Sequence, residues 1–161
     1  MTVAEYNKCV DLYADGVFRF ILKNIGDEEP ARDVVQESFV KLWDKRQHVE
    51  YGKSKTYLFT TAYHTMIDMI RKEKHTTPYR DQHQDKLAVN NEFSDLAEII
   101  EEAVSRLPEI QRTVVMLRDY EGYSYKEIGE ITNLNESQVK VYIYRARMAL
   151  KQYLVSMDKV V

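Results

Sequence analysis

The sequence predicts an all-α protein of two small helical domains joined by a flexible linker, with a helix-turn-helix in the C-terminal domain. Three observations lead to this prediction. Apolar residues recur at helical spacing along most of the chain. Capping boxes, which mark helix starts, occur at Thr2, Ser124 and Asn135. A polar stretch with little periodicity, residues 76–93, separates residues 1–75 from residues 94–161, and we interpret it as the linker.

The N-terminal domain is predicted to contain three helices. The first should run from Thr2 to about Asn24. The second should open near Pro30, a good first-turn residue, and continue to about Arg46. Residues 47–57 lack helical periodicity, which predicts a loop before the third helix. The first helix is expected to bury apolar positions at helical spacing, namely Tyr6, Val10, Tyr13, Ala14, Val17 and Ile21.

The outer face of the second helix is polar except for one residue. Val40 lies out of phase with the apolar stripe, among Asp33, Gln36, Glu37 and Lys41. A single exposed apolar residue is common and usually carries no meaning. It is also what the centre of a partner-binding face looks like. The pattern alone leaves both interpretations open.

The region from Lys41 to Lys74 combines positive charge with aromatic residues. It holds eight cations and four anions, and its third helix carries Tyr57, Phe59 and Tyr63. Single-stranded nucleic acid binding needs this composition, because cations follow the phosphates and rings stack on bases. A core helix with inward-pointing aromatics has the same composition, so both hypotheses stay open here.

The C-terminal domain is predicted to begin with two helices, one capped by Ser94 and one starting at Pro108. The first of them is expected to have Leu96 on its inner face. The helix-turn-helix follows from Ser124 to Leu154. Within it, Gly129 should allow a second helix to approach closely, at some cost in helix stability. Asn133 occupies a turn position that favours a left-handed backbone. The helix before the turn is expected to use Ile128 and Ile131 for its apolar face. The helix after the turn should bury the face formed by Val139, Ile143, Ala146 and Leu150.

The last helix is predicted to present a basic outer face. No Asp or Glu occurs between Ser137 and Lys151. In a helix-turn-helix the second helix enters the major groove, where Gln and Arg suit base edges and Lys and Arg suit phosphates. A helical hairpin with a solvated basic face is the alternative. The candidate DNA-facing residues are Ser137, Gln138, Lys140, Val141, Tyr144, Arg145 and Arg147.

Composition excludes several classes of protein. The net charge of −3 argues against a protein that coats nucleic acid by itself. No apolar run is long enough to span a membrane, and the N-terminus lacks a signal peptide pattern. The single cysteine, Cys9, rules out an internal disulfide, fits a reducing cytoplasm and is expected to be a small buried hydrophobe. Without metal-ligand spacing or a phosphate loop, we predict no metal, no cofactor, no catalytic residue and no enzyme.

Four stretches of the chain carry a resemblance to a known family. They are DVVQESFVKLW, YLFTTAYHTMIDMIRK, SRLPEIQRTVVMLRDYEGYSYKEIGEI and VKVYIYRARMALK. In this order they resemble the second conserved helix of region 2, the helix after the promoter-melting loop, the start of region 4 and its recognition helix. The whole chain resembles the extracytoplasmic-function (ECF) sigma factors, which are small members of the bacterial sigma-70 family.

The resemblance implies a role for each domain. Residues 1–75 would be sigma region 2, and residues 94–161 sigma region 4. The face that would dock on core RNA polymerase is Asp33, Gln36, Glu37, Val40 and Lys41. The loop from His48 to Thr56 would capture unpaired bases of the minus 10 element. The full minus 10 set is His48, Val49, Tyr51, Gly52, Lys53, Lys55, Tyr57, His64 and Arg71. The outer face of the last helix would read the minus 35 duplex.

The resemblance also implies binding partners, and the sequence differs from the family's usual residues at several positions. The partners would be core RNA polymerase, promoter DNA and an anti-sigma factor, which is often membrane-anchored. The protein would act in the cytoplasm. The family usually has asparagine at the position of His64 and alanine at that of Gly129, and often serine and arginine at those of Val141 and Tyr142. The promoter sequence, the inducing signal and the identity of the regulator therefore cannot be copied from relatives. A stand-alone helix-turn-helix regulator and a pure adaptor protein are the alternatives.

Overall fold

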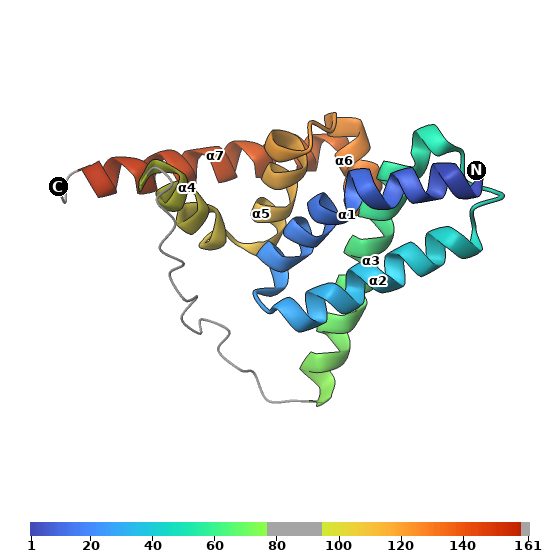
Figure 1. Ribbon diagram of the computed structural model, residues 1–161. Helices are drawn as coiled ribbons and strands as arrows, with labels where there is room; N and C mark the ends of the chain where they lie inside the picture. Colours follow the sequence, from blue (N-terminus) through green and yellow to red (C-terminus); the bar gives the residue numbers. More distant parts are fainter. Residues whose placement is uncertain (77–94, 159–161) are drawn as a thin grey trace. The chain divides into compact units, whose positions relative to one another are not determined.

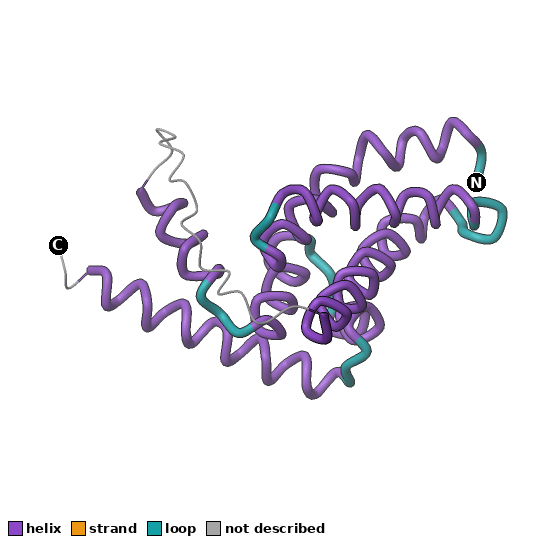
Figure 2. Tube along the Cα trace, turned by 90° about the horizontal axis from the view of Figure 1, so that it is seen from below, coloured by secondary structure: helices purple, strands orange, loops and turns teal. Residues whose placement is uncertain are grey.

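The computed structural model describes residues 1–76 and 95–158, and these fall into two units, Met1–Arg80 and Asp81–Val161 (Figure 1). Every regular element in the described ranges is a helix, and none is a strand, as predicted (Figure 2). The predicted linker lies outside the described residues, apart from Thr76 at the end of α3.

The first unit consists of α1 (Val3–Ile25), α2 (Glu28–Asp44) and α3 (Ser54–Thr76), each packed against the other two. Gly26 ends α1 with a φ of 80° and donates its N–H to the Leu22 carbonyl at 2.7 Å, a left-handed cap that glycine adopts without strain. The core contains apolar side chains from all three helices, among them Val17, Phe20, Ile21, Ala31, Leu42, Leu58, Phe59 and Met66.

The predicted inner face of α1 is correct at Val17 and Ile21, which are buried, and wrong at Val10. Val10 is 37% exposed, whereas Cys9 and Phe20 are buried. Because α1 packs against two helices, its buried stripe is wider than a single i, i+4 row and is shifted toward Cys9. The expectation that Cys9 is buried is confirmed.

The loop predicted over residues 47–57 is shorter in the structure. After α2 ends at Asp44, the chain forms a turn and a short 3-10 helix, Tyr51–Lys53. The α-helix α3 then begins at Ser54, so Lys55 and Tyr57 lie in its first turn. The local sequence has no apolar period here because the first turn of α3 places only Ser54 in the core.

The second unit consists of α4 (Asp95–Ser105), α5 (Glu109–Val115), α6 (Tyr125–Thr132) and α7 (Glu136–Asp158). A five-residue π-helical turn, Met116–Tyr120, extends α5, and the Glu121 N–H reaches the Met116 carbonyl at 3.2 Å. α7 packs against α4, α5 and α6. Its buried residues Val139, Ile143 and Ala146 are the predicted apolar face. Leu96 was expected inside but is 58% exposed, because the first turn of α4 projects beyond the core.

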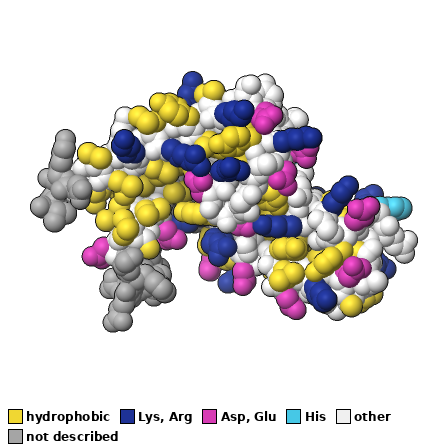
Figure 3. Space-filling model, turned by 90° about the horizontal axis from the view of Figure 1, so that it is seen from above, with side chains coloured by type: hydrophobic (Ala, Val, Ile, Leu, Met, Phe, Trp, Pro, Cys, Tyr) yellow, Lys and Arg dark blue, Asp and Glu magenta, His cyan; other side chains and the backbone are white. Residues whose placement is uncertain are grey.

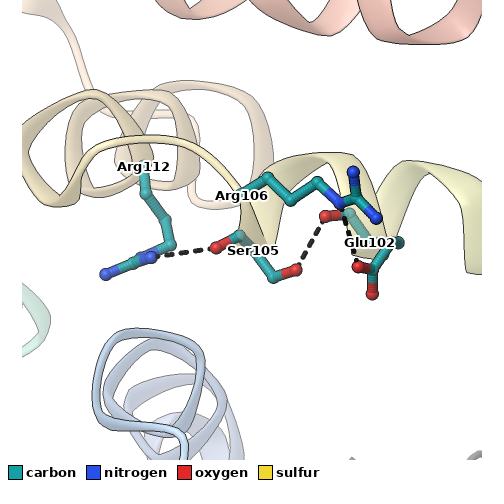
Figure 4. Close-up of polar contacts among 4 residues, drawn as sticks. All are labelled: Glu102, Ser105, Arg106 and Arg112. Atoms are coloured by element: carbon teal, nitrogen blue, oxygen red, sulfur yellow. Dashed lines mark hydrogen bonds and ion pairs between the residues drawn. The ribbon is translucent and has the colours of Figure 1, made fainter. Parts of the chain in front are cut away.

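The corner between α4 and α5 is closed by Arg112. Its guanidinium donates to the Ser105 carbonyl at the end of α4 at 3.2 Å (Figure 4). It also donates to the Leu107 carbonyl in the turn that follows, at 3.3 Å. On α4, Arg106 pairs with Glu102 at 3.1 Å. Partial burial lowers the pKa of Arg112, and the nearby Glu109 opposes that shift. One carbonyl at the end of α4 and one in the α4–α5 turn thus accept hydrogen bonds from a side chain of α5, which ties the two helices together.

Candidate protein and nucleic-acid interfaces

The first candidate surface is the outer face of α2, which we call the α2 face and define as Asp33, Gln36, Glu37, Val40 and Lys41. All five side chains are exposed, and their spacing places them on one side of the helix. Val40 is 57% exposed, so the out-of-phase position predicted from the sequence is confirmed. An apolar side chain at the centre of a polar ring is the arrangement expected of a contact surface.

Two residues of the α2 face are held in place by neighbours. Lys41 lies 3.4 Å from the Glu37 carboxylate and donates to the Thr65 hydroxyl on α3 at 3.2 Å. The lysine therefore bridges α2 and α3 as well as facing solvent. An exposed pair of this kind adds little stability, about 0.3–0.5 kcal/mol, but it orients the Glu37 carboxylate.

The second candidate surface surrounds the connection between α2 and α3. His48, Gly52 and Lys53 are exposed there, and Val49 and Tyr51 are half-buried. Lys55 and Tyr57, in the first turn of α3, are also half-buried. His64 and Arg71 are exposed further along α3. The predicted minus 10 residues are thus divided between a short connection and the helix after it.

Two of the aromatic residues that suggested base stacking belong to the core. Phe59 and Tyr63 are buried, and the rings of Phe20 and Phe59 lie 5.5 Å apart. For these two residues the core-helix hypothesis is the correct one. Tyr51 and Tyr57 retain accessible surface near the connection.

Two buried residues, Ser54 and Cys9, hold the connection between α2 and α3, and neither was predicted to do so. The buried Ser54 hydroxyl donates to the Tyr51 carbonyl at 2.6 Å. The Cys9 thiol donates to the Ser54 oxygen at 3.2 Å. A serine at the start of a helix was the available signal, because serine favours such positions. Its partner Cys9, 45 residues away, could not be found from local pattern.

The helix-turn-helix has the predicted turn geometry. Ser124 and Glu127 form the reciprocal capping box of α6. Asn133 has a φ of 62°, the left-handed conformation expected at this turn. A Cβ on Gly129 would lie 2.6 Å from the Leu134 carbonyl oxygen. What approaches Gly129 is therefore the backbone of the turn rather than a second helix.

The third candidate surface is the outer face of α7, which we call the α7 face: Ser137, Gln138, Lys140, Val141, Tyr144, Arg145 and Arg147. All seven side chains are exposed, with Tyr144 at 66% and Val141 at 45%. On the face of the molecule that Figure 3 draws, lysine and arginine side chains lie next to hydrophobic side chains. The sequence-predicted residues are thus brought together on one helix and directed outward.

Two residues of the α7 face have partners within the chain. Arg147 pairs with Asp119 of the π-helical turn at 2.7 Å, and this hydrogen bond raises the pKa of Arg147. Gln138 accepts the Asn135 N–H at 3.0 Å, while its own N–H donates to the Asn135 side chain at 2.8 Å. The capping box predicted at Asn135 is therefore present.

Metal and membrane interpretations gain no support from the described residues. No group of three or more His, Cys, Asp or Glu side chains in residues 1–76 and 95–158 could hold a metal ion. Within the same ranges, no helix has the length and apolar character needed to cross a membrane.

Comparison with known families decides between the remaining interpretations. Residues 9–76 match the model for sigma-70 region 2, and residues 97–150 match the model for sigma-70 region 4. The ECF RNA polymerase sigma factor SigM of Bacillus subtilis is 30% identical over 156 residues, which covers 94% of each chain. The chain belongs to the ECF sigma factors. SigW of the same organism is 29% identical, covering 90% of this chain and 86% of SigW.

Solved sigma factor structures have the same fold. The sigma factor RpoE of Bartonella quintana, solved with the anti-sigma factor NepR, gives a TM-score of 0.74 at 21% identity, covering 94% of this chain and 98% of that one. CnrH, solved with the cytosolic domain of CnrY, gives 0.66 at 20% identity, covering 94% and 88%. This sigma factor therefore directs transcription initiation as a non-enzymatic subunit of RNA polymerase. Because both sigma regions match, a stand-alone regulator is not favoured.

Proposed function

We propose that this sigma factor docks on core RNA polymerase through the α2 face, captures the minus 10 strand at the α2–α3 connection and reads the minus 35 duplex with the α7 face. The exposed Val40 among polar residues supports the docking role. Charged residues around an apolar centre would steer the encounter and fix its register.

The minus 10 role is proposed for His48, Val49, Tyr51, Gly52, Lys53, Lys55, Tyr57, His64 and Arg71. Capture of an unpaired base needs a stacking surface and nearby cations. Tyr51 and Tyr57 offer partly accessible rings, and Lys53 and Arg71 offer exposed cations. Unstacking a base costs a few kcal/mol, so we expect bases to be captured where the duplex is weakest.

The minus 35 role is proposed for the whole α7 face, and the geometry of this face carries the proposal. A left-handed turn at Asn133 and the close approach at Gly129 set α7 on α6 with its basic side outward. Val141 could contact a thymine methyl group, which serine at that position could not do in the same way. Lys140 and Arg145 supply cations for phosphates.

Regulation and location follow from the proposed partners. One solved structure holds RpoE in complex with the anti-sigma factor NepR, and another holds CnrH in complex with the cytosolic domain of CnrY. We propose that an anti-sigma factor, often membrane-anchored in this family, restrains this protein in the cytoplasm until a signal arrives.

The decisive experiment compares binding with and without polymerase. We expect the free protein to bind its promoter duplex weakly, because the net charge is −3 and one recognition helix buries little surface. Core polymerase should make binding strong by rendering the second contact intramolecular. Fluorescence anisotropy on a promoter fragment at physiological salt measures the promoter affinity without and with core polymerase. Specific binding by the free protein at about 10 nM would contradict the proposal.

A further inference from the structure

The start of α7 uses one glutamine side chain for two purposes. Its oxygen accepts the Asn135 N–H at 3.0 Å, which satisfies a backbone donor at the helix start. One of the two lone pairs of the Gln138 oxygen is therefore used before any DNA is bound. The amide nitrogen, which carries two protons, remains on an exposed side chain of the α7 face.

In the other two capping boxes of the described chain, the residue three positions after the cap is a glutamate rather than a glutamine. Thr2 is paired with Glu5, and Ser124 with Glu127. A carboxylate interacts more favourably with the positive end of a helix than an amide does. At α7 alone among these three boxes, the third position is a glutamine, which accepts the cap hydrogen bond and still offers donors.

The surroundings of Gln138 suit a contact with a base. It lines a shallow hollow together with Asn135, Ser137, Val141, Tyr142 and Arg145. The N-terminal residues of a recognition helix are the ones that meet base edges. Gln138 lies in the first turn of α7, two residues after Glu136.

We infer that Gln138 reads a hydrogen-bond acceptor on the major-groove edge of one base pair through its amide nitrogen, while its oxygen stays in the cap. The inference rests on the proposed minus 35 role of α7. The acceptors in the major groove are purine N7, guanine O6 and thymine O4. The paired contact of glutamine with adenine, which uses both amide atoms, would need the oxygen to accept a second hydrogen bond on its other lone pair while it holds the cap, so the inferred contact uses the nitrogen alone.

The first test changes the donor to an acceptor while keeping the cap. Gln138→Glu retains an oxygen for the Asn135 N–H and places a second oxygen toward the base. Holoenzyme assembled with core polymerase is used to select from promoters randomised across the minus 35 element. We expect one base pair to switch toward a donor, such as cytosine N4, and affinity for the original site to fall about 5- to 150-fold.

Two further variants make the outcome interpretable. Gln152→Glu makes the same chemical change 14 residues further along α7, about 21 Å away, and should leave the selected sequence unchanged. Arg145→Ala tests the α7 face as a whole. If Gln138→Glu selects the wild-type sequence while Arg145→Ala weakens binding, the inference is overturned and the minus 35 role survives. If neither variant alters selection or binding, both are overturned.

The second test uses the wild-type protein and therefore does not depend on the folding of a variant. At the base pair identified above, analogues remove each acceptor in turn, namely a 7-deazapurine for N7, 2-aminopurine for guanine O6 and 5-methyl-2-pyrimidinone for thymine O4, and an analogue without the exocyclic amino group removes the donor. We expect removal of the acceptor to weaken binding about fivefold or more and removal of the donor to have no effect. Equal losses from the two kinds of analogue would mean that both amide atoms contact the base.

Discussion

α3 and α7 are both 23 residues long and both combine cations with aromatic residues, yet they use their aromatics in opposite ways. In α3, Phe59 and Tyr63 are buried in the core of the first unit. In α7, Tyr144 is 66% exposed while Val139 and Ile143 are buried. Each residue turns a helix by about 100°, so the phase of an aromatic against the apolar stripe decides its role. Composition alone does not separate a core helix from a nucleic-acid-binding helix.

Matched alanine substitutions should show this difference most strongly. Phe59→Ala is expected to destabilise the first unit by about 3–5 kcal/mol, because Phe59 is fully buried. Tyr144→Ala should change stability by less than about 0.5 kcal/mol but weaken promoter binding by the holoenzyme. Urea unfolding followed by the fluorescence of Trp43, the single tryptophan, reports on the first unit, and circular dichroism reports on the second. Equal destabilisation by the two variants would contradict the comparison.

The second prediction concerns the backbone contact that orients α7. Gly129→Val places a Cβ 2.6 Å from the Leu134 carbonyl oxygen if nothing moves. We expect a loss of about 1–3 kcal/mol in stability of the second unit, together with weaker minus 35 binding. Glu130→Val is the matched control, because Glu130 is exposed on the same helix. It should cost no more than about 0.7 kcal/mol through helix propensity, and a similar loss in both variants would argue against a special role for Gly129.

The third prediction concerns a face that carries no aromatic residue. Glu37→Lys reverses a charge on the α2 face without reaching the core. Core-polymerase affinity is expected to fall at least tenfold, about 1.4 kcal/mol, with little change in thermal stability. Asp15→Lys makes the same charge change on the exposed side of α1 and serves as the control in the same titration. Unchanged polymerase affinity in Glu37→Lys would remove the case for the α2 face.

The smallest expected effect separates two arginines of the α7 face. Arg145→Ala should reduce the salt dependence of promoter binding by about one unit of slope if Arg145 contacts a phosphate. Arg147→Ala should reduce this slope less than Arg145→Ala does, because Asp119 already neutralises the Arg147 guanidinium at 2.7 Å. Asp119→Asn releases Arg147 and should increase the slope. Identical slopes for the two arginine variants would show that the Asp119 pair does not persist on DNA.

Much of the fold could be predicted from local sequence. The left-handed Asn133, the capping boxes, the buried stripe of α7 and the exposed Val40 follow from patterns within a few residues, and the structure has all of them. The family resemblance, carried by four stretches of sequence, is confirmed by the matches to both sigma regions.

The features that escaped prediction depend on contacts between distant residues. At the start of α3, Ser54 accepts a hydrogen bond from Cys9, 45 residues away, and Arg147 is paired with Asp119, 28 residues away. The exposure of Val10 depends on how α1 meets two other helices at once. The π-helical turn has no sequence signature that separates it from an ordinary helix end. The roles of individual interface residues stay predictions, because they concern partners outside the chain.

The π-helical turn at Met116–Tyr120 has a consequence for how this region can change in evolution. A π-helical turn holds about one residue more than an α-helical turn, so the extra residue is taken up within the turn. Deleting one residue there would leave an ordinary α-helical turn and keep the following chain in nearly the same direction relative to the buried Val114 and Val115. This segment can therefore lose one residue without redirecting the helix-turn-helix, whereas the same loss in an unbroken α-helix would turn the following chain by about 100°.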